Sequence, residues 1–564
     1  SDLETLVARL VDRPIRPLIS KGWSCETQLA SFVLSYDGVH APDVLAVCGA
    51  SAALSISEVP FPASVAAVRV ALIEGELAVN PTAAQMAAAE LDLVIAGTKE
   101  AVLMVEGSAQ FVPEETVVAA LELGLKAVAT IARALEAWSQ VVGASTYAPG
   151  LRTVPSDIKP KVLDVSVGGE KLGELLPRAL VGDTKEAREK AVFKLQSAAL
   201  AELTAMADGA SGGAGGAAYE AADVKSAFKE LASSTLRHVV STTGKRSDGR
   251  TTTEIRPIEI RISPLPKQVH GSSLFTRGET QSLSTTTLGG AAMAQRYEDL
   301  SGEHSKSFYL QYAFPPLSVG EVGRMGSPGR REIGHGNLAE RALRPALPLK
   351  DAFQYTVRVE SLITESCGSS SMASVCAGCL SMLAAGVPLS RKVAGVAMGL
   401  LLDESGGGGE PIILSDILGS EDALGTMDFK VAGDTTGISA FQLDIKCEGL
   451  SLPLMRAALE QARQGRLHIL ELMEEAMPHA ATLAEGVPRI VNLGIPPKMV
   501  GRLIGPGGAT INAITSESGV DNIAIDKAGP GSVCITGSND AAVQDAVSRI
   551  QALIDDDKPL ERST

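Results

Sequence analysis

The sequence is poor in cysteine and has no long apolar run. Its seven cysteines, an odd number, are scattered over 564 residues, which is not the pattern of a disulfide scaffold and favours a reducing compartment. No stretch of about 18 consecutive apolar residues occurs, so a membrane-spanning helix is excluded and no membrane partner is expected. The opening residues Ser-Asp-Leu-Glu-Thr-Leu lack the basic segment of a signal peptide and the Arg-rich pattern of a transit peptide, so we expect no targeting peptide in this chain.

Positive charge is also scarce. Lys and Arg total 50 against 66 Asp and Glu, which gives a formal net charge of −16. Such an excess argues against a protein coated for non-specific nucleic-acid binding, but it leaves room for a focused basic site. Residues 321–350 carry six basic side chains against three acidic ones. This segment is either a local anion-binding patch or an ordinary solvated helix face.

The chain contains an internal duplication. Residues 48–73 align without a gap with residues 376–401, at an offset of 328. Each copy predicts a small-residue helix, a Val-Pro turn and a buried strand. The match resumes where LDLVIAG at 91–97 parallels MDFKVAG at 427–433. Two copies of one α/β domain are therefore expected to flank a middle region.

The alignment also reaches upstream of these segments. Leu6-x-x-Arg9 before Arg13-Pro14 resembles Leu338-x-x-Arg341 before Arg344-Pro345. This similarity predicts that each copy begins with a helix of the same kind.

The middle region, about 150–240, has a different character. Lys185–Leu203 and Ala221–Leu236 show helical apolar spacing with charges on the other face. Gly209–Gly216 between them predicts a flexible linker. A second glycine run, Gly406–Gly409, predicts a hairpin tip and not a phosphate cradle, because no Lys-Ser/Thr and no helix follow it.

Small residues precede a helix of the second copy. Glu365-Ser-Cys-Gly-Ser-Ser-Ser371 leads into a helix that is expected to start near Met372. Backbone N–H groups at a helix N-terminus, together with three hydroxyls, can bind an anion; the alternative is an ordinary serine N-cap. The first copy has His40-Ala-Pro-Asp43 instead, where proline lacks an N–H and aspartate repels anions. We therefore expect this anion-binding site, the serine cradle, in the second copy only.

Two carboxylates and a lysine follow in the second copy. Asp428 and Lys430 are two residues apart on a predicted strand and should share a face, and Asp422 lies shortly before them. Such carboxylates can hold a divalent cation while the lysine offsets phosphate charge; the alternative is an ion pair on a strand edge. In the first copy, Val94 occupies the position of Lys430, and Met86 occupies that of Asp422. We therefore predict that only the second copy is catalytic.

A pair of arginines opens another predicted helix. Arg330 and Arg331 precede His335, and the helix also bears Arg341. Adjacent guanidiniums suit bidentate phosphate recognition. The histidine is a candidate general acid, a contact to a 2′-hydroxyl or a structural hydrogen-bonding group. Cys376-x-x-Cys379 lies inside a helix with no second ligand pair, so we expect neither a redox nor a metal role for it.

Four segments closely resemble the polynucleotide phosphorylases. The resemblance spans nearly the whole chain in the order RNase PH-like core, helical domain, second RNase PH-like core and KH domain. It implies an α/β (α+β) protein whose cores have a ribosomal-protein-like βαβα fold. The segments are FTRGETQ at 275–281, GSPGRREIGHG at 326–336, ESCGSSSMASVC at 365–376 and LSDILGSEDALGTMDFKVAG at 414–433. The implied domains are 1–145, 146–240, 241–484 and 485–564.

The resemblance also implies an activity. The enzyme would be a ring-shaped homotrimer that degrades single-stranded RNA from its 3′ end with inorganic phosphate. It would release nucleoside diphosphates, run in reverse as a template-independent polymerase and use Mg²⁺ or Mn²⁺.

The implied site residues fall into groups by role. Ser369, Ser370 and Ser371 would hold phosphate; Arg330, Arg331 and Arg341 would bind RNA; Asp422, Asp428, Lys430 and His335 would be catalytic, with both aspartates as metal ligands. Weaker RNA-binding candidates are Arg13 and Arg16, and the KH loop would contribute Gly505, Gly507 and Gly508.

The chain departs from the family pattern in several places. The N-terminal part of the first core and the OB-fold domain that follows KH in the family are absent from this sequence. Thr426 stands where the family has an acidic residue, and the GPGG loop around Pro506 lacks a basic residue. The AGCL helix, the Gly-rich insertion before Pro411 and the Glu517–Val520 turn favour the plant organellar branch. A chloroplast is therefore expected, with the mitochondrion or the bacterial cytoplasm as alternatives.

Two other functions stay open at this point. One is a non-catalytic, KH-bearing subunit of an RNA-binding ring, and the intact Asp422, Asp428 and Lys430 argue against it. The other is a hydrolytic 3′ exonuclease. The serine cradle argues against that activity, because water needs no phosphate pocket.

Overall fold

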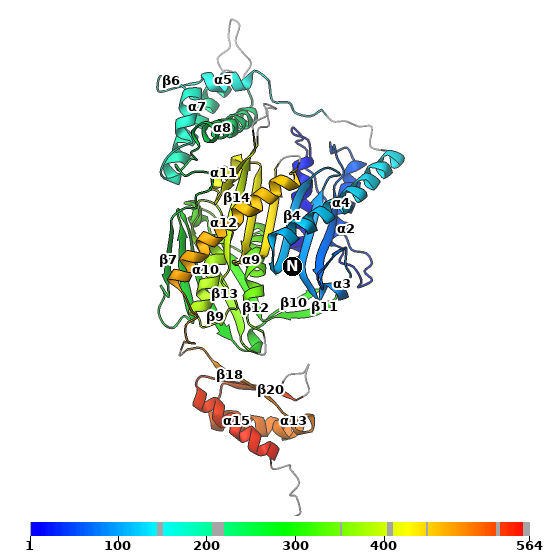
Figure 1. Cartoon of the computed structure of the whole chain (residues 1–564), viewed down its shortest axis with the longest axis vertical. Helices are drawn as coiled ribbons and strands as arrows, with labels where there is room; N and C mark the ends of the chain where they lie inside the picture. Colours follow the sequence, from blue (N-terminus) through cyan, green and yellow to red (C-terminus); the bar gives the residue numbers. More distant parts are fainter. Residues whose placement is uncertain are drawn as a thin grey trace, which may run out of the picture.

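The computed structural model describes residues 2–143, 150–205, 219–349, 352–402, 410–446, 449–484, 486–525 and 531–555. The predicted linker Gly209–Gly216 and the predicted hairpin tip Gly406–Gly409 lie outside these residues. The helical and KH domains lie at opposite ends of the molecule, with the two cores between them (Figure 1).

Both copies contribute strands to one continuous antiparallel sheet. Its order is β15-β14-β16-β17-β4-β3-β1-β2, and the strands are rich in Val, Ile and Ala because helices cover both faces. The first copy supplies β1 (Ala66–Ile73), β2 (Glu76–Val79), β3 (Ala89–Gly97) and β4 (Val102–Val112). The second supplies β14 (Ala394–Leu401), β15 (Ile412–Ser415), β16 (Met427–Gly433) and β17 (Ile438–Ile445).

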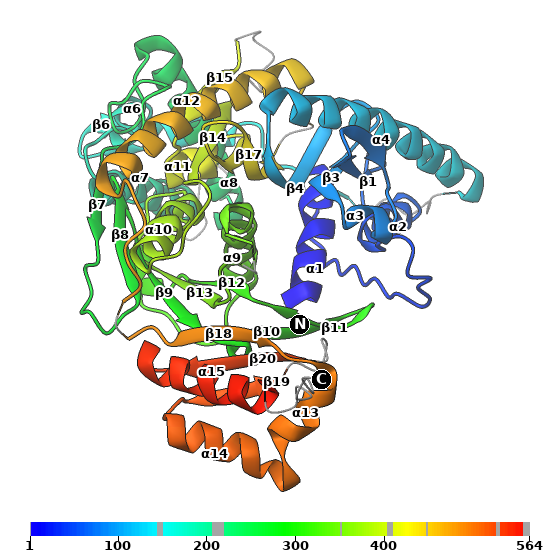
Figure 2. The ribbon, with the colours of Figure 1, turned by 60° about the horizontal axis from the view of Figure 1, so that its bottom comes forward.

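The two copies meet where β4 pairs with β17. Glu106 lies opposite Val94 in the first copy, and Gln442 lies opposite Lys430 in the second. Glu106 and Gln442 are therefore equivalent positions, and they also lie opposite each other across the joint. This register makes the joint a pseudo-twofold contact. On the outer side of the sheet, α4 (Glu114–Val142) of the first copy and α12 (Leu452–Ala476) of the second pack against each other (Figure 2).

Helix bounds confirm the duplication and correct its upstream register. Helix α1 (Asp2–Ile15) and α9 (Arg330–Leu343) have the same bounds at an offset of 328, and α2 (Asp43–Ser55) corresponds to α10 (Ser370–Ala384). The offset matches Arg13 with Arg341, so the expected match of Arg9 with Arg341 is wrong. The Leu-x-x-Arg pattern occurs twice in α1, at Leu6-x-x-Arg9 and Leu10-x-x-Arg13, which let the sequence align one turn out of register.

The Cys-x-x-Cys pair lies inside α10 and has a packing role. Cys376 and Cys379 accept hydrogen bonds from backbone N–H groups at residues 393–395. Cys48 and Ser51 of the first copy make the equivalent contacts to their own strand. Burial raises the pKa of both α10 thiols, so they are held as neutral acceptors.

A second, five-stranded sheet belongs to the second copy alone. Its order is β12-β13-β9-β8-β7, and β8 and β9 form the predicted hairpin at Gly278, whose φ is +53°. Helix α10 is buried along its whole length between this sheet and the large one. The strands are β7 (Ile258–Ile262), β8 (Gly271–Arg277), β9 (Thr280–Gly289), β12 (Phe308–Ala313) and β13 (Thr356–Glu365); β10 (Gln295–Asp299) and β11 (Gly302–Lys306) form a separate hairpin.

The first copy has a segment that corresponds to β13 but is not a strand. At the common offset, residues 28–37 match 356–365, yet in the described chain they pair with no strand. Phe32 is 81% exposed and Leu34 94% exposed. The described first copy therefore consists of its half of the large sheet and the helices that cover it.

The middle region is helical, as predicted. Helices α7 (Lys185–Ala205) and α8 (Ala221–Thr243) confirm the two expected helices. They pack with α5 (Ile158–Asp164) and α6 (Leu172–Ala179), beside the short strands β5 (Ser166–Val167) and β6 (Glu170–Lys171).

The C-terminal domain has its own small core around a three-stranded sheet, β18-β20-β19. Its elements are β18 (Arg489–Gly494), α13 (Pro497–Ile504), α14 (Ala509–Ser518), β19 (Asn522–Ile525), β20 (Ser532–Gly537) and α15 (Asp540–Asp555). Two short helices of the cores remain, α3 (Ala83–Met86) and α11 (Gly419–Leu424). Among the described residues, no helix combines the length and apolarity needed to cross a bilayer.

Candidate active site

A cavity of about 1060 Å³ lies between the second core and the helical domain. Most of the predicted site residues line it: Arg331, His335, Ser369, Ser370, Ser371, Asp422, Asp428 and Lys430, together with Arg13. Arg16, Arg330 and Arg341 are not among its lining residues. The cavity therefore joins the predicted phosphate cradle to the predicted metal ligands.

The serines form the N-terminus of α10 but do not act as an ordinary N-cap. Ser369 has a φ of +59° and makes no capping hydrogen bond through its side chain. The Ser370 hydroxyl lies 2.7 Å from the Tyr312 hydroxyl. The Ser371 hydroxyl is buried and has no hydrogen-bond partner among the described residues. Because buried polar groups are nearly always paired, this hydroxyl points to a ligand.

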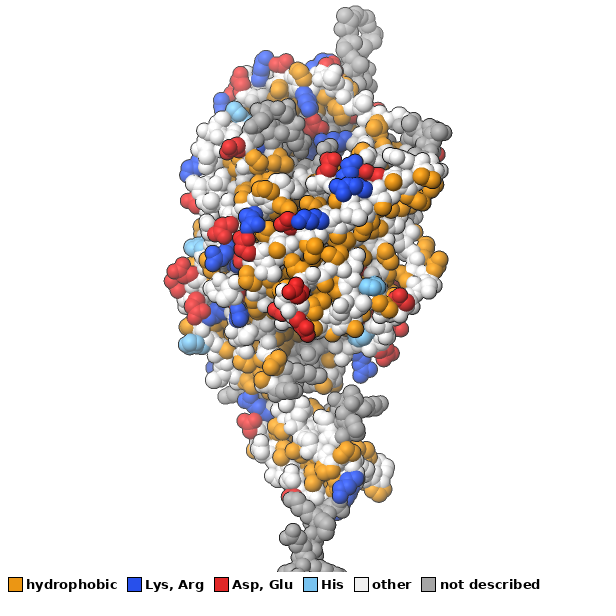
Figure 3. Space-filling view, turned by 45° about the vertical axis from the view of Figure 1, so that its right-hand side comes forward, with side chains coloured by type: hydrophobic (Ala, Val, Ile, Leu, Met, Phe, Trp, Pro, Cys, Tyr) orange, Lys and Arg blue, Asp and Glu red, His pale blue; other side chains and the backbone are white. Residues whose placement is uncertain are grey.

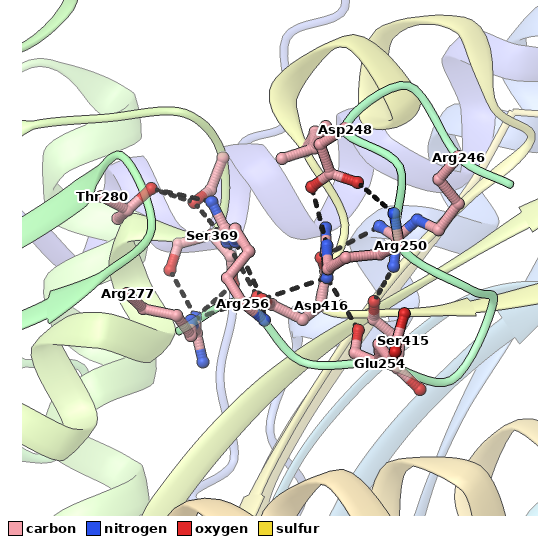
Figure 4. Close-up of polar contacts among 12 residues, drawn as sticks. Arg246, Asp248, Arg250, Glu254, Arg256, Arg277, Thr280, Ser369, Ser415 and Asp416 are labelled. Carbon is pink, nitrogen blue, oxygen red and sulfur yellow. Dashed lines mark hydrogen bonds and ion pairs between the residues drawn. The ribbon is translucent and has the colours of Figure 1, made fainter. Parts of the chain in front are cut away.

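The cradle loop is held from behind by buried arginines (Figure 4). Arg256 donates to the carbonyl oxygen of Cys367 at 3.1 Å, and Arg277 donates to that of Ser369 at 3.4 Å. Both arginines form ion pairs with Asp416, at 2.8 Å and 3.1 Å. Because arginines bind these carbonyl oxygens, the loop is fixed through its backbone acceptors. None of these contacts uses the Ser371 hydroxyl, which stays unpaired in the described part of the chain.

Asp416 is the centre of this network. Its side chain is fully buried and its φ is +50°, in the left-handed region. Burial alone would raise its pKa, but Arg256 and Arg277 outweigh burial and hold the pKa well below the ordinary value. Asp416 is therefore a permanent anion that keeps two cations under the cradle.

Helix α11, which carries Asp422, is anchored on both sides. Glu421 forms a fully buried ion pair with Arg246, which follows α8 directly. Ser233 of α8 donates to the last carbonyl of α11 at 2.7 Å. The helical domain therefore helps to fix the orientation of Asp422. The Asp422 carboxylate accepts a hydrogen bond from Lys446 at 2.6 Å.

Asp428 and Lys430 lie on β16 and form an ion pair. Their side chains are only 13% and 7% exposed, so this is not the surface pair of the alternative interpretation. Burial raises the pKa of Asp428, and the charges of Asp422 and Asp444 add to this, while Lys430 opposes it. The carboxylates thus crowd one another, and a bound cation would relieve their repulsion.

These residues fit a magnesium-type ion that shares its ligands with substrate. In the described part of the chain, no group of three or more His, Cys, Asp or Glu side chains is placed to hold a metal. Mg²⁺ is commonly bound by one or two carboxylates together with substrate phosphates, and Asp422 and Asp428 supply that number. The Thr426 hydroxyl donates to the Leu400 carbonyl at 3.0 Å, and Thr426 is not among the residues that line the cavity.

The first copy has an internal ion triad at the equivalent place. Asp43 stands at the position of Ser371, and Asp92 at that of Asp428. Arg69 of β1 binds both: it donates to Asp92 at 2.5 Å and 2.7 Å and also to Asp43. An arginine thus occupies the space that ligands would need. Sequence reasoning missed this triad, although the repeat carries the signal, since Arg69 aligns with Ala397.

His335 and Arg331 lie together on α9. The His335 ring is buried and packs edge-on against Tyr312, with the ring centroids 5.4 Å apart. Burial, followed by the charges of Lys430 and Arg331, lowers the pKa of His335 well below 6.5. The imidazole is therefore neutral near pH 7 and acts as a hydrogen-bonding group. Arg330 is exposed at the start of α9.

The other predicted arginines have carboxylate partners. Arg13 and Arg341, equivalent in the repeat, both form ion pairs with Glu106 at the joint. Arg13 also pairs with Asp444, and the exposed Arg16 pairs with Asp12 at 2.6 Å. Direct RNA contacts of these arginines stay a prediction. No sequence pattern indicated Glu106 and Asp444, because their role depends on pairing between β4 and β17.

Comparisons with known proteins agree with the architecture. A family model described as 3′ exoribonuclease family, domain 1, matches residues 1–60 and 254–388, and one described as domain 2 of that family matches 63–127. A KH domain model matches 490–552. The chain is 49% identical over 530 residues to the polyribonucleotide nucleotidyltransferase of Protochlamydia amoebophila, covering 94% of this chain and 73% of that protein. The chain belongs to the polyribonucleotide nucleotidyltransferase family.

A second relative extends this match. The enzyme of the same name from Chlamydia muridarum is 47% identical over 554 residues, which cover 98% of this chain and 77% of the relative. Family membership confirms the expected architecture of two RNase PH cores, a helical domain and a KH domain. It also confirms the expected enzyme class, polyribonucleotide nucleotidyltransferase, which is consistent with phosphorolytic 3′ exoribonuclease activity. Rice Rrp46 matches 41% of this chain and 100% of its own at 17% identity with a TM-score of 0.33, too low to support a conclusion.

The expected chloroplast location is wrong. The relatives above are bacterial proteins. Part of the signal for the organellar branch was the cysteine-rich helix, and those thiols serve packing between α10 and β14. A packing preference of this kind does not identify a compartment.

Proposed function

We propose that the second core performs phosphorolysis at RNA 3′ ends, while the first core is structural. The observation that carries the proposal is the unpaired, buried Ser371 hydroxyl in the same cavity as Asp422, Asp428 and Lys430. The ion triad of Asp43, Arg69 and Asp92 supports the structural role of the first core.

In the proposed reaction, inorganic phosphate is held by the α10 N-terminus and the Ser370 and Ser371 hydroxyls. A phosphate oxygen attacks the last phosphodiester of the RNA. The new P–O bond forms as the bond to the 3′ oxygen of the shortened RNA breaks; that oxygen takes up a proton, and a nucleoside diphosphate leaves. When bound by Asp422 and Asp428, Mg²⁺ or Mn²⁺ supplies neutralising charge at the scissile phosphate.

The remaining side chains bind and orient the substrate. The Lys430 ammonium, held beside Asp428, offsets charge on the transferred phosphate. Arg330 and Arg331 bind RNA phosphates, and the neutral His335 ring hydrogen-bonds the terminal ribose. The cationic pair under the cradle loop, Arg256 and Arg277, adds positive potential without touching the ligand.

Incubation of the protein with a 3′-hydroxyl RNA and Mg²⁺, with and without phosphate, tests this function. Phosphorolysis requires phosphate and yields nucleoside diphosphates. Nucleoside monophosphates formed without phosphate would identify a hydrolytic exonuclease, and RNA binding without cleavage would identify a non-catalytic subunit.

The KH domain is proposed to capture RNA through the GPGG loop between α13 and α14. Gly505, Gly507 and Gly508 have φ values of +70°, +59° and +85°. A Cβ on Gly505 would lie 2.8 Å from the backbone N of Thr510, so glycine is required there. Glycine backbone of this kind can approach a single-stranded sugar-phosphate chain closely.

The chain is further proposed to form a homotrimeric ring. Apolar side chains gather over the cores on the face that Figure 3 shows, and the first core has large exposed apolar side chains, among them Phe32, Leu34 and Val141. Exposed apolar patches of this kind mark interaction surfaces, and a ring closes by cyclic symmetry. Light scattering should give about three times the 58.4 kDa chain mass, and a fully active monomer would contradict the ring.

A further inference from the structure

The active-site cavity extends from the second core into the helical domain. One face of α7 and one face of α8 line it. On α7 the lining positions include Lys185, Phe193 and Gln196, and on α8 they include Lys225 and Lys229. These positions recur at spacings of three and four residues, so each helix turns a continuous stripe towards the cavity.

The lining stripes of α7 and α8 together form one wall of the cavity. This wall begins at the serine cradle and leads away from it. Lys185 donates to the Ser366 carbonyl of the cradle loop at 3.1 Å. Phe193 lies eight residues further along α7, which places it about 12 Å beyond Lys185. Lys225 lies eight residues from Ser233, the α8 residue that contacts α11, so it is also about 12 Å from that contact. The wall thus offers a second surface some two helical turns from the reacting groups.

The side chains on this surface are not used by the fold. Phe193 is 70% exposed although it lines a cavity. Lys225 and Lys229 are exposed and have no hydrogen-bond or ion-pair partner among the described residues. Glu189, an acidic neighbour on the same wall, is paired with Lys185 at 3.8 Å. Two such ammonium groups that line the same cavity as an exposed ring suit a ligand that has both phosphate and an aromatic base.

The position of this wall favours a mononucleotide over RNA as its ligand. The KH domain lies at the opposite end of the molecule from the helical domain (Figure 1). RNA held by KH therefore approaches the cavity from the end away from α7 and α8. The helical-domain side of the cavity is then left for the small reactants.

We propose that α7 and α8 form a nucleoside diphosphate subsite, through which the product leaves and the polymerisation substrate enters. The base stacks on Phe193, and Lys225 and Lys229 attract the diphosphate. This inference rests on the proposed phosphorolysis, because that reaction is what makes a nucleoside diphosphate the product.

Three variants test the subsite: Phe193→Ala, the double variant Lys225→Ala/Lys229→Ala, and Lys194→Ala as a matched control. Lys194 is exposed on α7 next to Phe193 but does not line the cavity. The readouts are KM for ADP in polymerisation, KM for phosphate in phosphorolysis, and Kd for a single-stranded RNA measured without phosphate. Thermal melting of each variant checks that it is folded.

Phe193→Ala should raise KM for ADP by about tenfold, the size expected from loss of one base-stacking contact. The double lysine variant should raise it by about the same factor, because two cations that attract the diphosphate are lost. Saturated turnover and the RNA Kd should stay within about twofold of the unmodified protein, and Lys194→Ala should change nothing. Phe193→Ala should leave KM for phosphate unchanged, because phosphate has no base to stack.

Two results would overturn the subsite. An unchanged KM for ADP in folded, active variants would show that no mononucleotide uses this wall. A weakened RNA Kd with an unchanged KM for ADP would assign the wall to RNA instead. If the unmodified protein does not release nucleoside diphosphates at all, the proposed phosphorolysis fails first, which separates the two failures.

Discussion

Glu106 and Gln442 occupy the same position in the two copies and lie opposite each other where β4 pairs with β17. Only one of them is charged. Glu106 forms ion pairs with both Arg13 and Arg341, which are themselves equivalent in the repeat. A single carboxylate thus forms an ion pair with one arginine from each copy at the pseudo-twofold joint.

We expect Glu106→Gln to destabilise the joint, because it leaves two largely buried arginines short of one negative charge. The free energy of unfolding should fall by about 3 kcal/mol, as for a broken buried ion pair. Glu115→Gln removes a pair whose carboxylate is 77% exposed and should cost less than about 1 kcal/mol. Thermal melting of both variants makes the comparison, and equal losses would contradict a special role for Glu106.

The same carboxylate predicts a pH dependence. Burial alone would raise the pKa of Glu106, but Arg341 and Arg13 outweigh it and hold the pKa below 4.5. A lowered pKa means that the stabilisation is fully present above pH 4.5 and is lost as the pH falls through the folded-state value. Melting temperature should therefore drop less on acidification in Glu106→Gln than in the unmodified protein. Parallel acid profiles would refute this.

Ser371→Ala should raise KM for phosphate by about tenfold, the effect of one lost hydrogen bond to a charged group. The melting temperature should not fall, because this hydroxyl has no partner within the described ranges of the chain. Ser51→Ala is the matched control, since the Ser51 hydroxyl accepts a hydrogen bond from Val65 at 2.7 Å. That variant should lose stability and keep its KM for phosphate. The opposite pattern would remove Ser371 from phosphate binding.

His335 should not titrate during catalysis near neutral pH. Since burial lowers its pKa well below 6.5, the neutral ring stabilises the fold above pH 6.5, and this stabilisation is lost as the pH falls towards the folded-state value. His335→Asn should flatten the acid side of the melting profile and leave the shape of kcat/KM between pH 6.5 and 8 unchanged. A step in kcat/KM in this range that disappears in the variant would instead assign a protonated His335 to the reaction.

Gly507→Asp should weaken RNA capture without slowing saturated turnover. A side chain on Gly507 would meet no atom within 4 Å, so the added carboxylate would face the proposed RNA path. Gly519 ends α14 with a similar φ of +71° and equally open surroundings, so Gly519→Asp controls for strain and charge in the same domain. We expect about a tenfold weaker RNA Kd for the first variant only. Equal effects of both variants would contradict the GPGG assignment.

The architecture could be predicted from the sequence because the internal repeat shows the same order of helices and strands twice. The bounds of the equivalent helices and strands agree to within three residues at offsets of 328 and 336, so periodicity and alignment were enough to find them. The serines, Asp422 and Lys430 stood out because the first copy lacks them, whereas Asp428 has the counterpart Asp92 and was found from its position two residues before Lys430. The site residues that sequence reasoning missed owe their role to contacts between distant segments. Asp416 binds arginines from β8 and from the segment before β7, and Glu106 binds arginines from two helices.

The wrong location had a related cause. A cysteine-rich helix is no mark of lineage here, because both copies use a small polar or sulfur side chain to accept a hydrogen bond from a strand N–H. What a buried side chain contacts explains its identity better than the compartment does.

The central claim is that one copy is catalytic and the other structural. The most direct measurement is the rate of ADP release from poly(A) with phosphate and Mg²⁺ by Asp428→Asn and Asp92→Asn, which change equivalent residues. Asp428→Asn should lower turnover by about three orders of magnitude, because charge stabilisation by a bound metal is worth several kcal/mol. Asp92→Asn should keep turnover within about twofold, since Asp92 pairs only with Arg69 in the triad. Near-normal turnover by Asp428→Asn, or an equal loss in both variants, would contradict the account.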